Sequence, residues 1–89
     1  MIREFSYTSS SGTKDRKVFV IRETEKYIEG LDLTLLDEDS VKTITNKYKD
    51  IVPSNNKETK IVLEDFNPDW NKAYRQFSKS KIDSYNECS

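Results

Sequence analysis

The chain has 89 residues, of which 35% are charged and 11% are aromatic. A chain of this length has room for one domain with one compact core, which excludes a second domain. Fifteen Lys and Arg residues against sixteen Asp and Glu residues give a formal net charge of −1, so any affinity for nucleic acid must come from a local patch.

The residue types that the chain lacks exclude several kinds of catalytic site. The chain has no histidine, which excludes the Ser-His-Asp and Cys-His arrangements, and its only cysteine is Cys88. No intrachain disulfide can form, so a reducing compartment is expected. No segment has the ~20 apolar residues of a membrane span, and the start does not resemble a signal peptide. We therefore expect a soluble cytoplasmic protein that is not an enzyme, needs no cofactor and binds no membrane.

The first two strands are expected to form a hairpin. Ile2, Phe5 and Tyr7 belong to an extended segment, and residues 8–13 (Thr-Ser-Ser-Ser-Gly-Thr) favour a turn. Residues 18–21 (Val-Phe-Val-Ile) are consecutive β-branched or aromatic residues bounded by charges, a pattern typical of a strand covered on both faces.

A third strand and a helix are expected next. After a polar turn at residues 23–26, residues 27–33 alternate beyond Gly30, which predicts a half-buried strand with a bulge or bend at that glycine. From Asp37 the spacing of apolar residues changes to three and four, which predicts an amphipathic helix that Asp37 caps and that ends before Pro53.

The C-terminal half gives conflicting signals. Residues 60–64 (Lys-Ile-Val-Leu-Glu) predict another strand covered on both faces. Residues 67–69 (Asn-Pro-Asp) are a favourable helix start. Beyond them, four apolar residues share one helical face: Trp70, Ala73, Tyr74 and Phe77. Local rules alone therefore predict a helix over this last stretch.

Three blocks of sequence follow one another along the chain. The first carries an aromatic residue, a glycine, an arginine and two alternating valines: Tyr7, Gly12, Arg16, Val18 and Val20. The second is residues 27–32 (Tyr-Ile-Glu-Gly-Leu-Asp), and the third is residues 74–82 (Tyr-Arg-Gln-Phe-Ser-Lys-Ser-Lys-Ile). In this order the blocks resemble the WYL family, in particular its short phage-associated relatives. Ile28 stands where that family often has tyrosine, and residues 33–73 separate the second block from the third.

The resemblance implies a fold. It makes residues 73–77 a strand, with a helical turn allowed at 68–72, because tertiary pairing overrides local propensity. The fold class expected is mainly β with one inserted helix (α+β), as a small Sm-like/SH3-like antiparallel β-barrel over residues 1–84 with a tail at 85–89. The core expected is Phe5, Val18, Val20, Ile28, Leu31, Val41, Ile44, Ile61, Leu63 and Phe77.

A basic and aromatic segment is the first candidate site. Residues 72–81 carry four bases and no acid. We expect Arg75, Lys79 and Lys81 to contact the phosphates of a nucleic acid or another anionic ligand, with Tyr74 or Trp70 stacking on a base. The resemblance adds Arg16 as an accessory cation and implies a regulatory, phage-encoded module. Alternatively, these bases only solvate an edge strand and prevent aggregation.

An acidic segment is the second candidate site. Residues 29–39 carry five acids and no base. Asp37, Glu38 and Asp39 are expected to bind a host protein if the chain is a small inhibitor or adaptor. Capping and the helix dipole explain these acids without a metal, so no metal site is expected. A homo-oligomer built through edge strands is also compatible with a small barrel.

Overall fold

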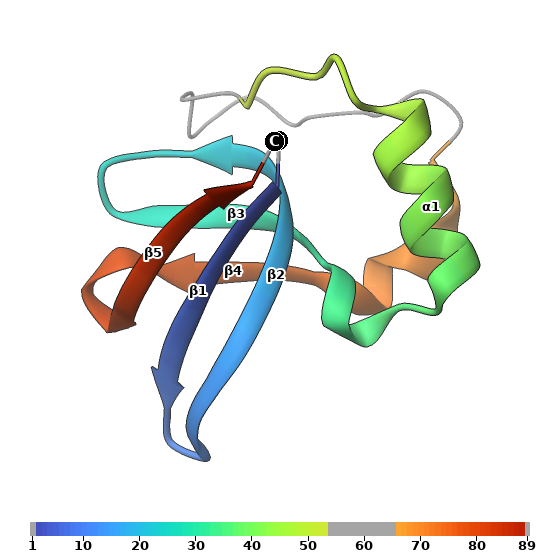
Figure 1. Cartoon of the computed structure of the whole chain (residues 1–89). Coiled ribbons are helices and arrows are strands. Elements are labelled where there is room, and N and C mark those ends of the chain that lie inside the picture. Colours follow the sequence, from blue (N-terminus) through green and yellow to red (C-terminus); the bar gives the residue numbers. More distant parts are fainter. Residues whose placement is uncertain (1, 54–65, 89) are drawn as a thin grey trace.

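The structure is a computed structural model that describes residues 2–53 and 66–88, with side chains described as far as residue 82. Five antiparallel strands form one sheet in the order β4-β3-β2-β1-β5 (Figure 1). The elements in chain order are β1 (Ile2–Ser9), β2 (Gly12–Glu23), β3 (Tyr27–Asp32), the 3-10 turn η1 (Leu33–Leu35), α1 (Glu38–Lys47), η2 (Pro68–Ala73), β4 (Tyr74–Ser78), η3 (Lys79–Lys81) and β5 (Ile82–Cys88). The expectation of a mainly β fold with one inserted helix is confirmed. Within the described residues, no ladder joins β4 to β5 and closes the sheet.

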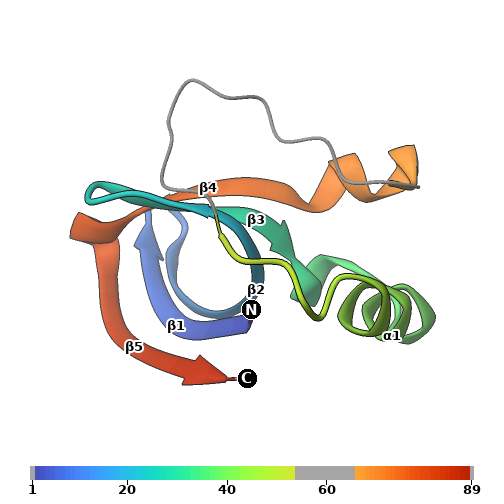
Figure 2. The same ribbon diagram turned by 90° about the horizontal axis from the view of Figure 1, so that it is seen from above.

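The sheet is curled and buries apolar side chains on both faces. In the view from above, α1 lies outside the curl of the sheet (Figure 2). The inner cluster consists of Phe5, Val18, Val20, Ile28 and Phe77. The outer cluster, which α1 and η2 cover, consists of Phe19, Ile21, Leu31, Leu33, Ile44, Tyr48 and Trp70. Two apolar faces on one small sheet explain how a chain with 35% charged residues still builds a core.

Strand β2 serves both clusters because it alternates between them, as expected for a strand covered on both faces. Val20 lies opposite Gly30 and Arg22 lies opposite Glu29, so Ile21 is an extra residue that bulges out of the ladder. A bulge of this kind directs two consecutive side chains to one face. Ile21 joins the outer cluster, and Arg22 lies on the same face, where it reaches Glu29 at 3.3 Å.

Gly30 permits this bulge by letting β2 approach β3 closely. A Cβ atom at Gly30 would lie 2.0 Å from the carbonyl oxygen of Phe19 and 3.1 Å from the backbone nitrogen of Ile21. The bulge expected at Gly30 is therefore confirmed, with the extra residue on the opposite strand. At the β1–β2 turn, Gly12 has a φ of 112°, a conformation that favours glycine.

The core expected from the sequence is largely confirmed within the described residues. All expected members there are buried except Val41, which is partly buried against the outer cluster. Ile61 and Leu63, with the strand expected at residues 60–64, lie outside the described residues. The expected core omitted these buried residues: Phe19, Ile21, Leu33, Tyr48, Trp70 and Ala73.

The segment with conflicting signals is a helical turn followed by a strand. Asn67 caps η2, its side chain accepting a hydrogen bond from the Asp69 backbone N–H at 3.0 Å. The turn ends at Ala73, and β4 then pairs with β3, with Phe77 opposite Ile28. The local prediction of a helix through Phe77 is wrong, because pairing along β3 satisfies the backbone and buries Phe77 in the inner cluster.

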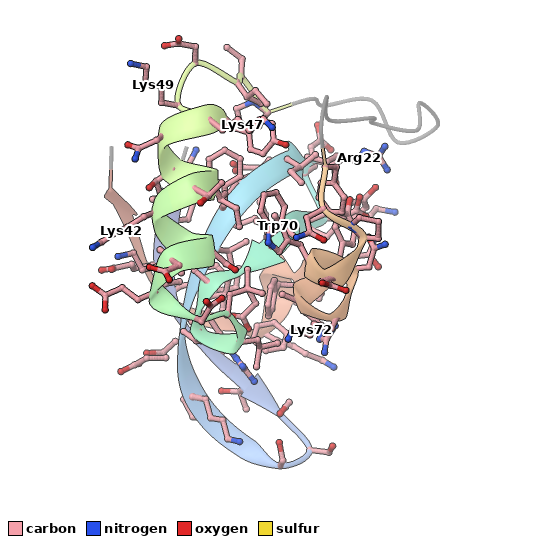
Figure 3. All side chains as sticks on the ribbon, turned by 90° about the vertical axis from the view of Figure 1, so that its right-hand side faces the viewer. Arg22, Lys42, Lys47, Lys49, Trp70 and Lys72 are labelled. Carbon is pink, nitrogen blue, oxygen red and sulfur yellow. The ribbon has the colours of Figure 1, made fainter. Side chains whose placement is uncertain are left out.

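Helix α1 forms as expected and begins after Asp37, but the Asp37 side chain makes no capping hydrogen bond, so the expected cap is present in position only. Ile44 is fully buried, and the Tyr48 ring lies 6.3 Å from the rings of both Phe19 and Trp70. Trp70 lies between α1 and the sheet (Figure 3). The described helices include none that is long and apolar enough to cross a membrane.

The C-terminal strand departs from the expected domain boundary. β5 pairs with β1 as far as Cys88, which lies opposite Ile2. The boundary expected between residues 84 and 85 falls inside this strand, and residues 85–88 complete β5 instead of forming a tail. The physical reason is that pairing with β1 satisfies backbone groups that a free tail would leave to water.

Replacing Gly30 by alanine tests the close approach of β2 and β3. We expect Gly30→Ala to lower the free energy of unfolding by about 3 kcal/mol, because the methyl group meets backbone atoms that cannot move without breaking the ladder. Gln76 is exposed on β4, so Gln76→Ala should change the free energy of unfolding by less than about 0.5 kcal/mol. Urea denaturation followed by the fluorescence of Trp70, the only tryptophan, measures both. Equal stabilities of the two variants would contradict this account of the bulge.

Candidate functional site

The side chains of the basic and aromatic segment fall into two groups. Arg75 on β4 and Lys81 on η3 are exposed, whereas Tyr74 and Lys79 are partly buried and engaged with carboxylates. Arg75 donates to the backbone carbonyl of Tyr74 at 2.9 Å. No ion pair is recorded for Arg75 or Lys81 within the part of the chain whose side chains are described.

Lys79 takes part in a charged group at one end of the inner cluster. Its ammonium lies 2.9 Å from one oxygen of Glu23, and Arg3 lies 3.1 Å from the other oxygen. Only 22% of the Glu23 side chain and 13% of the Arg3 side chain are exposed. The ammonium of Lys79 therefore neutralises an internal carboxylate, which limits its availability to a ligand.

Tyr74 belongs to a second network, on the outer face of the sheet. Its hydroxyl donates to Glu29, which also pairs with Arg22. Burial and the neighbouring Glu29 raise the pKa of the Tyr74 hydroxyl above its usual value, which keeps the hydroxyl a hydrogen-bond donor to Glu29. The ring packs against the outer cluster. Trp70 is only 5% exposed, so the expectation that it stacks on a base is wrong: its ring fills the core beneath α1.

Arg16 lies away from Lys79, at the other end of β3. It pairs with Asp32 at 3.0 Å, and only 1% of the Asp32 side chain is exposed. Asp32 also accepts hydrogen bonds from the backbone N–H and the hydroxyl of Thr34. Arg16 thus contacts the last residue of β3, whereas Lys79 lies beside the first. A six-residue strand at ~3.3 Å per residue separates them by roughly 17 Å.

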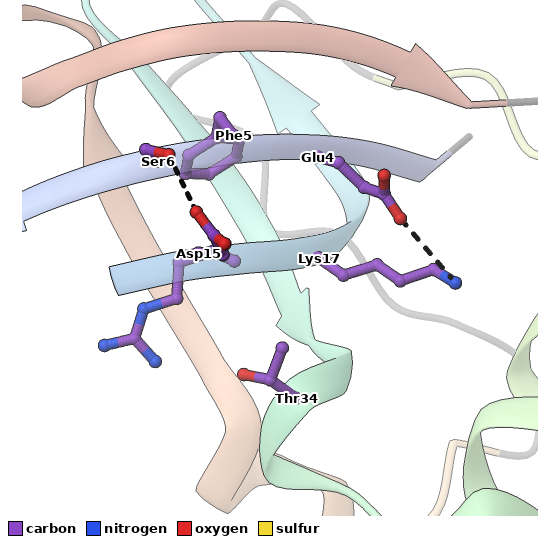
Figure 4. A pocket seen from close by; sticks show the side chains of 7 residues that line it. Glu4, Phe5, Ser6, Asp15, Lys17 and Thr34 are labelled. Atoms are coloured by element: carbon purple, nitrogen blue, oxygen red, sulfur yellow. Dashed lines mark hydrogen bonds and ion pairs between the residues drawn. The ribbon is translucent and has the colours of Figure 1, made fainter. Parts of the chain in front are cut away.

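A shallow pocket of about 380 Å³ lies beside Arg16 (Figure 4). Its lining consists of Glu4, Phe5, Ser6, Asp15, Arg16, Lys17 and Thr34. The Ser6 hydroxyl donates to the Asp15 carboxylate at 2.8 Å, and the Lys17 ammonium lies 3.9 Å from the Glu4 carboxylate. Charges of both signs line the pocket and bond across the strands, so it offers no concentrated charge to an anion.

A residue that the sequence did not single out joins Lys79 and Lys81. The Lys79 N–H donates to the carbonyl of Lys26 at 2.9 Å, so the β2–β3 turn lies against η3. Figures 1 and 2 show both turns on the same side of the sheet. We call Lys26, Lys79 and Lys81 the basic corner. The only sequence signal for Lys26 was its place in a polar turn, because its approach to η3 depends on the pairing of β3 with β4.

The acidic residues Asp37, Glu38 and Asp39 are all exposed at the start of α1. The Ser40 hydroxyl holds the pKa of Asp37 below its usual value. Glu38 lies 3.4 Å from Lys42 one turn later. Within the described residues, no group of three or more Asp, Glu or Cys side chains could hold a metal ion.

The exposed lysines around α1 do not form a uniform basic surface. Lys42, Lys47 and Lys49 come from α1 and the turn after it, and Lys72 from η2 (Figure 3). Acidic residues of the same segments are exposed among them: Glu38, Asp39, Asp50 and Asp69. The balance of charge makes this side a weaker candidate for an anion than the basic corner.

Comparison with known proteins assigns no family to this geometry, since no family model, no curated protein and no solved structure matches the chain.

The Arg16–Asp32 pair is expected to act on stability. Asp32→Asn keeps the shape of the side chain but leaves the Arg16 guanidinium without its carboxylate, and should lower the free energy of unfolding by about 3 kcal/mol. Glu4→Gln breaks the exposed pair with Lys17 and should cost less than about 0.5 kcal/mol. Urea denaturation measures both variants. A small effect of Asp32→Asn would return Arg16 to the candidates for ligand binding.

Proposed function

We propose that the chain is a non-enzymatic regulatory module that binds single-stranded nucleic acid through Arg75 and the two exposed lysines of the basic corner, Lys26 and Lys81. The proposal rests on the bonding partners of the four arginine side chains. Arg3, Arg16 and Arg22 each pair with a carboxylate at 3.0 to 3.3 Å. Arg75 is exposed and bonds only to a backbone carbonyl among the described residues. Its guanidinium therefore keeps most of its donors for a ligand.

The spacing of the cations favours an extended polyanion. Arg75 precedes Ser78 on β4 by three residues, which places it about 10 Å from the start of η3 at ~3.3 Å per residue. Lys26 and Lys81 supply charge at that end. A nucleic-acid strand brings several phosphates along such a line, and each contact releases counterions. Lys79 has a structural role in this proposal, since Glu23 holds it.

We also propose that the sheet is a WYL-like barrel of the Sm-like/SH3-like type, and that the protein is phage-encoded. The strand order, in which β5 returns to β1, and the 3-10 turn η3 between β4 and β5 support the barrel. The three sequence blocks support the family. Parts of these blocks contribute to the sheet or to its edge in the structure: Tyr7, Arg16, the bulge at Gly30 and the β4–η3 segment.

Binding of a fluorescent oligothymidylate, measured by anisotropy over a range of salt concentrations, tests the function. Affinity should fall steeply with salt, and Arg75→Ala/Lys81→Ala should weaken binding and reduce the slope of log K against log salt by about 1.4. Lys14→Ala/Lys49→Ala removes the same charge from exposed positions on other elements and should leave the slope unchanged. Salt-independent binding, or equal effects of the two double variants, would refute the proposal.

A second candidate function uses the exposed acids at the start of α1. Asp39 has no ion pair among the described side chains, and Asp37 stays ionised, so both offer charge to a basic host protein. In this case the chain is a small inhibitor or adaptor. A tagged chain should then retain a host protein that Asp37→Lys/Asp39→Lys loses and that Arg75→Ala/Lys81→Ala keeps. Retention by the charge-reversed variant would remove this candidate.

A further inference from the structure

We infer that the turn η3 is a subsite for one phosphate group, held by the hydroxyls of Ser78 and Ser80 and the ammonium groups of Lys26 and Lys81. The inference rests on the proposed function and names the atoms that would receive a phosphate. Phosphate chemistry is common to a nucleic-acid backbone and to free phosphate, so the ligand class is a phosphate oxyanion.

The hydroxyl pair provides donors at the surface. Ser78 Oγ and Ser80 Oγ lie 2.9 Å apart, and either can be the donor. Because one hydroxyl hydrogen makes this bond, the other hydroxyl keeps its hydrogen for a further acceptor. Ser80 is exposed and Ser78 half-buried, so the pair opens to solvent.

Three contacts fix the turn before any ligand arrives. The Ser78 N–H donates to the Tyr7 hydroxyl at 3.2 Å, and the Lys79 N–H donates to the carbonyl of Lys26 at 2.9 Å. Thr24, which is 7% exposed, accepts from the Lys26 N–H at 3.3 Å and so holds the neighbouring turn. The backbone that carries the donors is held in this way, so an anion need not order it on binding.

The charge around the turn favours an anion. Lys26 and Lys81 are exposed, and the acids of the adjoining turn are Glu23 and Glu25. Both oxygens of Glu23 are already bonded, one to Arg3 and one to Lys79. Of these two acids, Glu25 is the exposed one, and its charge is set against those of two exposed lysines, Lys26 and Lys81. The hydroxyl and ammonium donors together outnumber the two oxygens of a carboxylate and suit the several oxygens of a phosphate.

The chain contains a matched control for the hydroxyl pair. Ser9 and Ser11, in the β1–β2 turn, have hydroxyls 3.0 Å apart that are also exposed. The turn from Ser9 to Gly12 carries no lysine. A site that needs only two hydroxyls would therefore exist there as well, and one that needs the lysines would not.

The experiment follows backbone amide chemical shifts of the whole chain during titration with inorganic phosphate, at constant ionic strength set with sodium chloride, and then with oligothymidylate. Shifts with phosphate should centre on residues 78–81 and Lys26. Ser78→Ala/Ser80→Ala should weaken phosphate binding about fivefold. Ser9→Ala/Ser11→Ala should bind as the unchanged chain does. If the first double variant fails to fold, Lys81→Met replaces it, with the same expected loss.

The outcomes separate the subsite from the function. Shifts centred on the turn that the serine or lysine variants weaken support the subsite, and the oligothymidylate arm shows whether a nucleic-acid backbone also occupies it. Phosphate binding unaffected by Ser78→Ala/Ser80→Ala, or shifts centred elsewhere, overturn the subsite. If oligothymidylate still binds with a salt slope that depends on Arg75, the proposed function survives that result. Absence of binding to both ligands overturns both.

Discussion

The structure depends on the close approach of β2 to β3 at Gly30. Because no side chain stands between Gly30 and the Phe19 carbonyl, β2 can carry one extra residue at Ile21. If β2 paired with β3 without this bulge, the alternation of side chains would continue unbroken through Ile21 and Arg22 would point toward the inner cluster, since a shift of one residue reverses the face of every following side chain. The bulge thus lets one strand bury valines on one face and place a charged network on the other.

Charge in this protein is organised around the ends of the inner cluster. Glu23 with Arg3 and Lys79 lies at one end, and Asp32 with Arg16 lies at the other. Each carboxylate is largely shielded from water, which makes its pairing necessary, because an unpaired buried charge is costly. These two carboxylates engage two arginines and one lysine, and Glu29 on the outer face engages a third arginine, Arg22. The cations left for a ligand are those of the basic segment that pair with no internal carboxylate. They are fewer than the sequence suggests.

The sequence predicted the elements whose signals are local. The run at residues 18–21 identified β2, and the spacing from Asp37 identified α1. Residues 74–77 could not be assigned locally, because Tyr74 and Phe77 also fit a helical face, and only pairing with β3 decides between the two. The charge pairs around the site were harder to predict than the strands. Glu23 and Lys79 are 56 residues apart, and nothing local indicates which of sixteen acids a given lysine will meet. Lys26 was missed for the same reason.

The pairing of β1 with β5 joins the most distant strands of the chain, with Ile2 opposite Cys88. Such a ladder cannot form until β5 has left the ribosome, and closing so long a loop is entropically slow. Folding is therefore expected on the order of milliseconds to seconds, as for other small domains dominated by distant contacts. Until β5 arrives, β1 is exposed along one side during synthesis, and this interval is when the nascent chain is most open to aggregation.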